Sequence, residues 1–416
     1  MAPKVSKITI KNYRAFRNEH SIAINSLTLF FGYNNTGKSA LIRLFPLLKD
    51  SFSSTKVNCF TNSYLDYSSS SIRGSLFQQL ATQNERKLSF GVNWDSGDML
   101  SFSLTQEGLS SEVMNSLSIK IGQNSLEYHP SIDDTSMLEN KEDQTDQVSF
   151  YNFRLPHNEP FNELITSLSN SVHWISSIRN HPPRKFEIGI GVPLELKPNG
   201  DGIGPLIWHL AETQSESIND INQWLKNSCG SILNFADDKG SVDGRKFVAL
   251  ETIHDVPNEY QDQEKAIRTP ILDSGEGIAQ ALPVVTLCAM AANGELGENP
   301  IIAIEQPELH LHPHATVELA KFLILCIQKN KSVRYILETH SESFLRAMQI
   351  AIVDQSIEAS DISCYWVDKN ETTSTPHLVT FDNEGFITGS WPQGVFREAL
   401  NQSKELVQLR KSKGSS

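Results

Sequence analysis

The residues with the most specific chemical pattern lie in the segment FGYNNTGKS, which ends at Ser39. Its spacing is GxxxxGK[ST], with Gly32 and Gly37 at the glycine positions. Glycine permits backbone angles that a side chain would block, so successive N–H groups can converge on an anion. In this pattern Lys38 reaches the β- and γ-phosphates of a nucleotide, and the Ser39 hydroxyl binds Mg²⁺. The segment therefore predicts a phosphate-binding loop.

The sequence on each side of this loop favours that interpretation over a turn that has the spacing by chance. An apolar run precedes the loop and a helical pattern follows it, and the positive end of such a helix faces the bound phosphate. The residues expected to contact the nucleotide form one continuous segment: Gly32, Asn34, Asn35, Thr36, Gly37, Lys38, Ser39 and Ala40.

A phosphate loop also needs an acid for its metal ion, and Glu305 is the candidate. It follows the apolar run IIAI, and a carboxylate at the end of a buried strand can hold Mg²⁺ beside Ser39. The alternative is a solvated strand end, which would be the better interpretation of one isolated acid. The chain continues from Glu305 as QPELHLHP, and the next apolar run ends in Thr339-His340-Ser341, so we favour the metal-binding role.

Strands that alternate with helices around this loop predict an α/β fold with a largely parallel sheet. Pro46 should kink or end the helix that begins at Lys38. The acidic segment 131–147 is expected to be a mobile loop. The other predicted elements are strands at 6–16, 20–24, 27–32, 87–94, 99–105, 117–122, 246–253, 299–308, 333–341, 362–369 and 376–382, and helices at 160–171, 203–213, 216–228, 276–292 and 314–330.

Composition sets broad limits on the function. With 416 residues, 39% hydrophobic and 20% charged, the chain can form two or three lobes around a large core. Its net charge of −13 excludes a basic nucleic-acid coat, and we interpret the local basic group Arg179, Arg184 and Lys185 as a solvated face. Five scattered cysteines without a CxxC pair, no apolar leader and no membrane-length apolar run predict a cytoplasmic protein with no membrane partner.

Four segments in this order resemble one family: FGYNNTGKS, DSGEGIAQALPVV, IIAIEQPELHLHP and YILETHSESFL. The chain is similar to ABC-type ATPases of the SMC and DNA-repair class, and in particular to their small bacterial relatives without coiled coils. These relatives include the ATPases of anti-phage systems such as Septu and the OLD proteins. The resemblance covers residues 1–50 and 270–416 well and the middle poorly. It implies a P-loop NTPase fold of the ABC-type ATPase head, with a mixed sheet, an inserted α+β middle region, and ATP and Mg²⁺ as cofactors.

The resemblance assigns further residues by position. The signature motif would be Ser274, Gly275, Gly277 and Gln280, which in this family binds the γ-phosphate of ATP held by a second protomer. A serine hydroxyl and glycine amides at a helix N-terminus suit an anion, although the segment taken alone could be a glycine-rich helix cap. His340 would be the switch histidine that touches the γ-phosphate. The alternative is a strand-end histidine whose hydrogen bonds are made within the protein.

The position after Glu305 departs from the family pattern. Most ABC ATPases have a catalytic glutamate there, whereas this chain has Gln306, whose amide cannot accept a proton from water. Glu308 could substitute as the base. Alternatively, hydrolysis is slow and ATP mainly holds a dimer closed. The sequence leaves both open.

Two weaker patterns lie near these motifs. The histidines of HLHPH, residues 310–314, could bind zinc, but in the family this segment lies where two protomers meet, so we favour the contact role. Gln78 or Gln79 in RGSLFQQL is a weak candidate for the glutamine that senses Mg²⁺.

These patterns lead us to expect a nucleotide-dependent dimerisation switch. Two copies, or a higher oligomer, would sandwich ATP and act on a separate effector such as a nuclease, on DNA, or on both. The alternatives are an OLD-like nuclease and an SMC-like DNA-repair ATPase. The sequence has no sustained heptad pattern, which excludes a coiled-coil tether. The HLHP and THSE segments disfavour the ATPase subunit of a membrane transporter. The expected regions are an ATPase lobe at 1–100, a partner-binding or regulatory insertion at 101–269 and a second ATPase lobe at 270–416.

Overall fold

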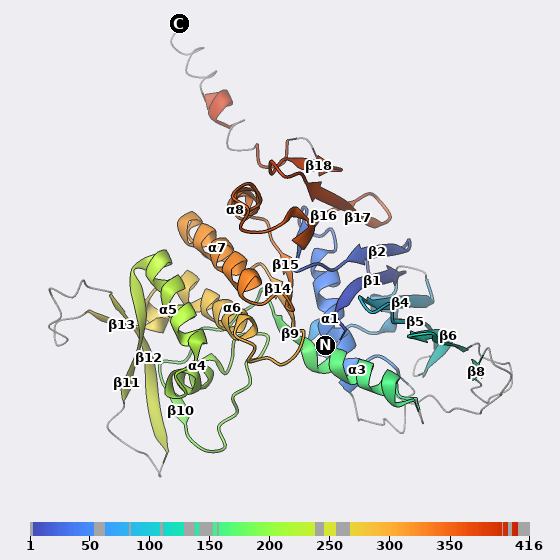
Figure 1. Ribbon diagram of the computed structural model, residues 1–416, viewed down its shortest axis with the longest axis horizontal. Coiled ribbons are helices and arrows are strands. Elements are labelled where there is room, and N and C mark those ends of the chain that lie inside the picture. Colours follow the sequence, from blue (N-terminus) through green and yellow to red (C-terminus); the bar gives the residue numbers. More distant parts are fainter. Residues whose placement is uncertain are drawn as a thin grey trace, which may run out of the picture.

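Three β-sheets and the helices packed around them make up the described part of the chain (Figure 1). The structure, a computed structural model, describes residues 3–53, 63–82, 85–108, 111–128, 138–140, 153–155, 158–237, 245–254, 267–392, 394–397 and 402–406. Most of the acidic segment 131–147 lies outside these residues.

The central sheet has seven strands and is mixed. Its order is β18 (Ile387–Gly389), β17 (Ser374–Phe381), β16 (Ile362–Lys369), β3 (Leu27–Phe31), β15 (Arg334–Glu338), β14 (Ile301–Glu305) and β9 (Val172–Ile175). The five strands from β16 to β9 are parallel, and β17 and β18 extend the sheet antiparallel. The predicted α/β fold with a mixed sheet is therefore confirmed, and the loop after β3 begins in its centre.

The central strands are apolar throughout because both faces of the sheet are covered. In β3, Leu29 points into the core on one face and Phe30 into the core on the other. The first core contains α6 (Glu276–Ala292) and α7 (Pro313–Lys329), and the second contains α1 (Lys38–Ser53).

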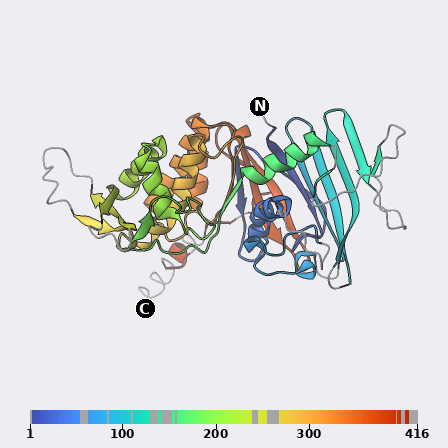
Figure 2. The same ribbon diagram turned by 90° about the horizontal axis from the view of Figure 1, so that it is seen from below.

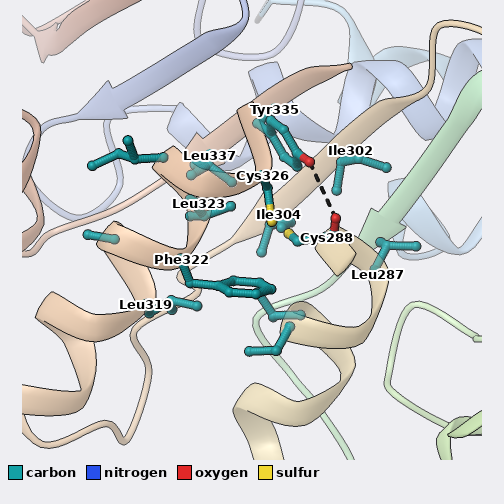
Figure 3. Close-up of a cluster of buried hydrophobic side chains, with 14 of the residues drawn as sticks. Leu287, Cys288, Ile302, Ile304, Leu319, Phe322, Leu323, Cys326, Tyr335 and Leu337 are labelled. Carbon is teal, nitrogen blue, oxygen red and sulfur yellow. Dashed lines mark hydrogen bonds between the residues drawn. The ribbon is translucent and has the colours of Figure 1, made fainter. Parts of the chain in front are cut away.

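Figure 3 shows part of the first core, where Tyr335 of β15 lies over Cys288 of α6. The Tyr335 hydroxyl donates to the Cys288 carbonyl at 3.4 Å, which satisfies a polar group that is otherwise surrounded by apolar side chains. Phe322 and Leu323 of α7 complete the packing between these helices and the sheet.

The helix after the phosphate loop continues past the proline. α1 continues from Lys38 to Ser53 and contains Pro46 in its interior, so of the two expected outcomes, a kink or an end, the helix does not end there. Buried side chains lie on both sides of the proline, Phe45 and Leu47 among them. Tertiary packing thus maintains the helix despite the backbone hydrogen bond that proline cannot make.

A second, antiparallel sheet forms most of one lobe (Figure 2). Its order is β2 (His20–Ala23), β1 (Val5–Lys11), β4 (Lys87–Trp94), β5 (Met99–Glu107), β6 (Ser111–Ile121), β7 (Asn124–Tyr128) and β8 (Leu138–Asn140). The boundary expected at residue 100 falls inside β5, and the sheet continues across it. Helix α3 (Glu159–Ser171) packs against α1, and the short η1 (Ser70–Ile72) and α2 (Phe77–Leu80) lie in the connection between α1 and β4.

The other lobe carries a small antiparallel sheet and two helices (Figures 1 and 2). The sheet consists of β10 (Phe186–Ile188), β12 (Lys246–His254) and β11 (Ser231–Asp237), with β13 (Arg268–Pro270) also paired to β12. Helices α4 (Ile203–Glu212) and α5 (Glu216–Cys229) pack against α6, and η3 (Ile271–Asp273) leads into it. Beyond β15, α8 (Glu342–Val353) packs on α7, and η4 (Ala359–Asp361) precedes β16.

Candidate nucleotide-binding site

The phosphate loop follows directly from the central strand β3. Gly32 has φ +149°, and a Cβ there would lie 2.3 Å from the Val367 carbonyl oxygen of β16, so only glycine fits. The Lys38 ammonium donates to the carbonyls of Gly32 at 3.0 Å and Tyr33 at 2.6 Å. Thr36 donates its hydroxyl to the same Tyr33 carbonyl at 2.9 Å. Lys38 therefore lies inside the loop, where an anion held by the loop amides would meet it.

Burial shapes the charge of this lysine. Desolvation lowers the pKa of Lys38, and attraction to Glu338 partly offsets the shift. A bound phosphate would add negative charge beside the ammonium and favour its charged form further.

The ends of β14 and β15 bring two carboxylates to the same edge of the sheet. Glu305 and Glu338 are paired residues in the parallel register of these strands, and both are buried. Glu338 also pairs with Phe30 in the register of β15 and β3, so it lies one strand closer to the phosphate loop than Glu305 does.

Glu305 is held by an arginine that follows the phosphate loop on α1. Arg43 donates from Nε to Oε1 and from Nη2 to Oε2, each at 2.6 Å, and the Ser177 hydroxyl donates to Oε2 at 3.1 Å. Only 1% of the Glu305 side chain is exposed, so the Arg43 contact neutralises a carboxylate that is removed from water.

Glu338 has different neighbours. Burial raises its pKa, while a hydrogen bond from Ser39 and attraction to Lys38 lower it. Its Oε2 atom is buried and has no hydrogen-bond partner among the described residues. A buried carboxylate oxygen without a partner, next to the hydroxyl of the phosphate loop, is a donor set that suits a hard cation such as Mg²⁺.

The predicted residues after β14 lie at the same edge. The Gln306 backbone has φ +45°, and its N–H donates to the Glu338 carbonyl at 2.9 Å. Glu308 is half-buried, and its Oε1 accepts from the Thr339 hydroxyl and from the His340 N–H, each at 2.8 Å. Glu308 thus fixes the turn that carries the histidine.

His340 points its ring toward the second carboxylate. Its Nε2 is 3.9 Å from Oε1 of Glu338 and has no hydrogen-bond partner among the described residues. Burial lowers the pKa of His340 to about 4, and Lys38 contributes in the same direction, so the imidazole is neutral at pH 7.

A buried arginine connects this edge to α6. Arg179 donates to the carbonyls of Gln280 at 2.9 Å and Glu305 at 3.2 Å, and also to the carbonyl of Gln306. Burial lowers its pKa to about 10. The interpretation of Arg179 as part of a solvated basic face is therefore wrong, because its guanidinium satisfies backbone carbonyls inside the protein.

The signature residues lie at the start of α6. The Ser274 hydroxyl contacts the Pro270 carbonyl at 3.1 Å and the Thr252 hydroxyl at 2.8 Å. Gly275 has φ +101°, and a Cβ there would meet no atom within 4 Å. By contrast, a Cβ on Gly277 would lie 2.4 Å from the His310 carbonyl oxygen, so this glycine permits close contact with the loop after β14.

The three histidines of HLHPH have separate partners. His310 lies 3.7 Å from Glu276, His312 accepts from the His314 N–H at the start of α7, and the His314 ring contacts the Asn227 carbonyl. The described part of the chain contains no group of three or more His, Cys, Asp or Glu residues placed to hold a metal ion.

A cavity of about 430 Å³ adjoins the phosphate loop. The loop and the start of α1 supply Asn35, Gly37 and Ala40, and Gln79 also lines the cavity, consistent with its weak assignment near the nucleotide. Three arginines on its wall add positive charge: Arg14, Arg43 and Arg73. The cavity could accept the part of a nucleotide that extends beyond the loop amides.

The structure brings the predicted strand-end residues to one edge of the sheet. The sequence patterns assigned no role at this edge to four residues that lie there: Arg43, Ser177, Arg179 and Glu338. Glu338 had a usable signal, because an acid ends the apolar run of β15 just as Glu305 ends that of β14. The arginines had no such signal in the sequence, because the residues that they contact at this site lie far away along the chain.

Comparison with known proteins agrees with this architecture. The AAA ATPase domain family matches residues 4–187 and 194–345. No curated protein is detectably similar. The SMC head bound to the C-terminal winged-helix domain of ScpA is 11% identical, with a TM-score of 0.50 over 91% of this chain and 98% of that one. The SMC head domain from Thermotoga maritima is also 11% identical, with a TM-score of 0.43 over 91% and 99%.

The family match and the likeness to the SMC head bound to ScpA concern the fold, which is that of a P-loop ATPase head. Among the described residues, no helix combines the length and apolar character that a bilayer crossing needs. The family match covers most of the chain, including the phosphate loop, both strand-end acids and His340. The chain belongs to the AAA ATPase domain family and is an ATPase.

Proposed function

We propose that the protein is a nucleotide-dependent dimerisation switch. Two copies bind two Mg·ATP between them, and each copy presents Ser274 and Gly275 to the phosphate held by the loop of the other. Lys38 contacts the phosphates, and Ser39 and Glu305 lie on the metal side. The closed dimer then acts on a separate effector.

The observation that carries this proposal is the placement of two helix N-termini on opposite faces of one sheet. α1 starts at the phosphate loop and packs in one core, whereas α6 starts at Glu276, just after its N-cap Gly275, and packs in the other. Both are long helices whose N-termini attract anions. Within one chain the sheet separates them, so a second copy is the natural source of a signature motif for each nucleotide.

The surroundings of the signature motif support the same conclusion. Gly275 is exposed and its missing side chain leaves open space, so a phosphate from another protomer could approach the backbone closely. Gly277 and Gln280 tie this end of α6 to the loop after β14 through His310 and Arg179. Contacts made by a partner at the signature motif would therefore reach Glu305 and Gln306.

Gln306 occupies the position of the usual catalytic glutamate, which favours slow over fast ATP hydrolysis. Gln306 can orient a water molecule but cannot take its proton. Slow hydrolysis would prolong the closed state, which suits a protein that signals to an effector while ATP is bound.

The effector is proposed to be a separate protein, and the resemblance to anti-phage ATPases favours a nuclease in a defence system. The segment after His340 forms α8 and the strands β16–β18, and these strands complete the central sheet. That segment is therefore used by the ATPase fold, which disfavours an OLD-like nuclease domain within the described residues. The lobe of α4, α5 and β10–β13 is the proposed site of partner or DNA contact.

Ser274→Arg tests the dimer. A long cation at the start of α6 should block the approach of a second protomer while each chain still binds nucleotide. Sedimentation with a non-hydrolysable ATP analogue should show a dimer for the wild type and a monomer for the variant, at equal nucleotide affinity. Ser96→Arg, on an exposed turn between β4 and β5, is the matched control and should still dimerise. An unchanged dimer in the Ser274 variant would show that this segment is only a helix cap.

A further inference from the structure

The paired acids at the ends of β14 and β15 differ in what they contact. Both are almost fully buried, and both end strands that point to the phosphate loop. The motif pattern assigns the metal-binding role to Glu305 alone. The contacts of Glu338 indicate a second candidate.

Glu305 has little capacity left for another ligand. Both of its oxygens accept from Arg43 at 2.6 Å, and Ser177 adds a third hydrogen bond. Releasing this carboxylate would leave the Arg43 guanidinium, which is only 15% exposed, without its partner. Breaking a buried pair of this kind is strongly unfavourable.

Glu338 has free capacity at the position where a nucleotide-bound cation would lie. Its Oε2 is buried and unpartnered among the described residues, and the side chain is 4% exposed. The groups around it are the Ser39 hydroxyl, the Lys38 ammonium and the His340 ring. The strand order places it beside β3, whose loop would hold the phosphates. Buried polar atoms normally have a partner, so an orphaned oxygen here indicates a missing ligand.

We propose that Glu338, together with Ser39, supplies the protein oxygens that face the Mg²⁺ of bound Mg·ATP, while Arg43 keeps Glu305 as a supporting residue. A carboxylate and a hydroxyl are the hard oxygen donors that Mg²⁺ prefers, and one or two protein oxygens with phosphates and water are its usual set. This inference deepens the proposed function, since it rests on nucleotide binding at the phosphate loop, but it does not depend on dimerisation.

Binding of Mn²⁺, a paramagnetic substitute for Mg²⁺, tests the inference without measuring turnover. Electron paramagnetic resonance of the full chain with a non-hydrolysable ATP analogue gives the affinity for the metal. Glu338→Gln should weaken Mn²⁺ binding by about 10-fold or more, whereas Glu305→Gln should weaken it less. Glu318→Gln is the control, because this carboxylate on α7 is 11% exposed and pairs only with Lys321 in the described contacts.

The reverse order, with normal Mn²⁺ affinity in Glu338→Gln and a loss in Glu305→Gln, would overturn the inference. Glu338→Asp keeps the charge opposite Lys38 and covers the case in which the glutamine variant does not fold. Its shorter side chain should also weaken Mn²⁺ binding, and a wild-type affinity would contradict the proposal. Failure of the wild type to bind the analogue would instead refute the nucleotide site itself, so the two failures are distinguishable.

Discussion

Arg43 of α1 and Glu305 of β14 form a bidentate ion pair that joins the helix after the phosphate loop to the end of a central strand. The pair is 262 residues apart in sequence and almost fully buried. It connects two parts of the candidate nucleotide site that come from distant parts of the sequence. The contribution of this ion pair can be measured as a change in the free energy of unfolding.

Arg43→Met should lower the free energy of unfolding by about 3–5 kcal/mol, because it leaves Glu305 charged, buried and unpaired. The double variant Arg43→Met/Glu305→Gln should recover part of this loss. Chemical denaturation measures both. Arg346→Met is the control, because Arg346 and Glu342 form an exposed pair on α8, where the cost should stay below about 1 kcal/mol. A small effect for Arg43→Met would mean that the pair contributes little.

Lys38→Ala should abolish nucleotide binding, because the phosphates lose the loop cation. The ammonium also ties together the carbonyls of Gly32 and Tyr33, so the loop loses internal contacts as well. Isothermal titration with ATP and Mg²⁺ is the direct measurement. Lys49→Ala, on the same helix, should bind normally because its ammonium contacts the Val172 carbonyl instead. Equal affinity in the Lys38 variant would refute the phosphate-loop assignment.

The residue that activates water can be identified from Gln306 and Glu308. If the protein is a slow switch, wild-type turnover is low and Gln306→Glu should raise it. If Glu308 is the base, Glu308→Gln should reduce turnover by about 10²–10⁴-fold and spare ATP binding. Glu308 uses its Oε1 to support the turn through Thr339 and His340, whereas its Oε2 has no hydrogen-bond partner among the described residues, so the two variants decide between the cases. No gain in the first variant and normal turnover in the second would rule out both.

Stability should fall as the pH drops from about 6.5 toward 4, in part because of His340. The pKa of this imidazole is about 4 in the folded chain and near 6.5 when unfolded, so protons bind the unfolded state preferentially in this range. If the side chain were fully buried, this pKa difference would lower the free energy of unfolding by about 3.4 kcal/mol. Because the side chain is 35% exposed, we expect a loss of about 1–2 kcal/mol.

Thermal or chemical unfolding of the wild type and of His340→Gln over this pH range checks the effect as a difference. The variant should lose less stability on acidification. His173 of β9, whose pKa burial also lowers to about 4, should give a similar but independent difference in His173→Gln. Parallel pH profiles for the wild type and the His340 variant would contradict the prediction.

The sequence determined the elements and the candidate residues that depend on local order. The loop from Gly32 to Ser39 could be found because glycine spacing, an apolar strand and a helix start act within a few residues. Helix 276–292 was predicted with the same bounds as α6, and the strands ending at Glu305 and Glu338 were found because continuous apolar runs are typical of sheets covered on both faces.

Tertiary structure decided what these residues do to one another. The order β3, β15, β14 places Glu338 between the loop and Glu305, and no local pattern encodes the order of strands in a sheet. From the sequence, Arg43 and Arg179 are ordinary charged residues; packing directs one to a carboxylate and the other to four backbone carbonyls. Electrostatic roles depend on distance and burial in space, and folding sets both between residues that are far apart along the chain.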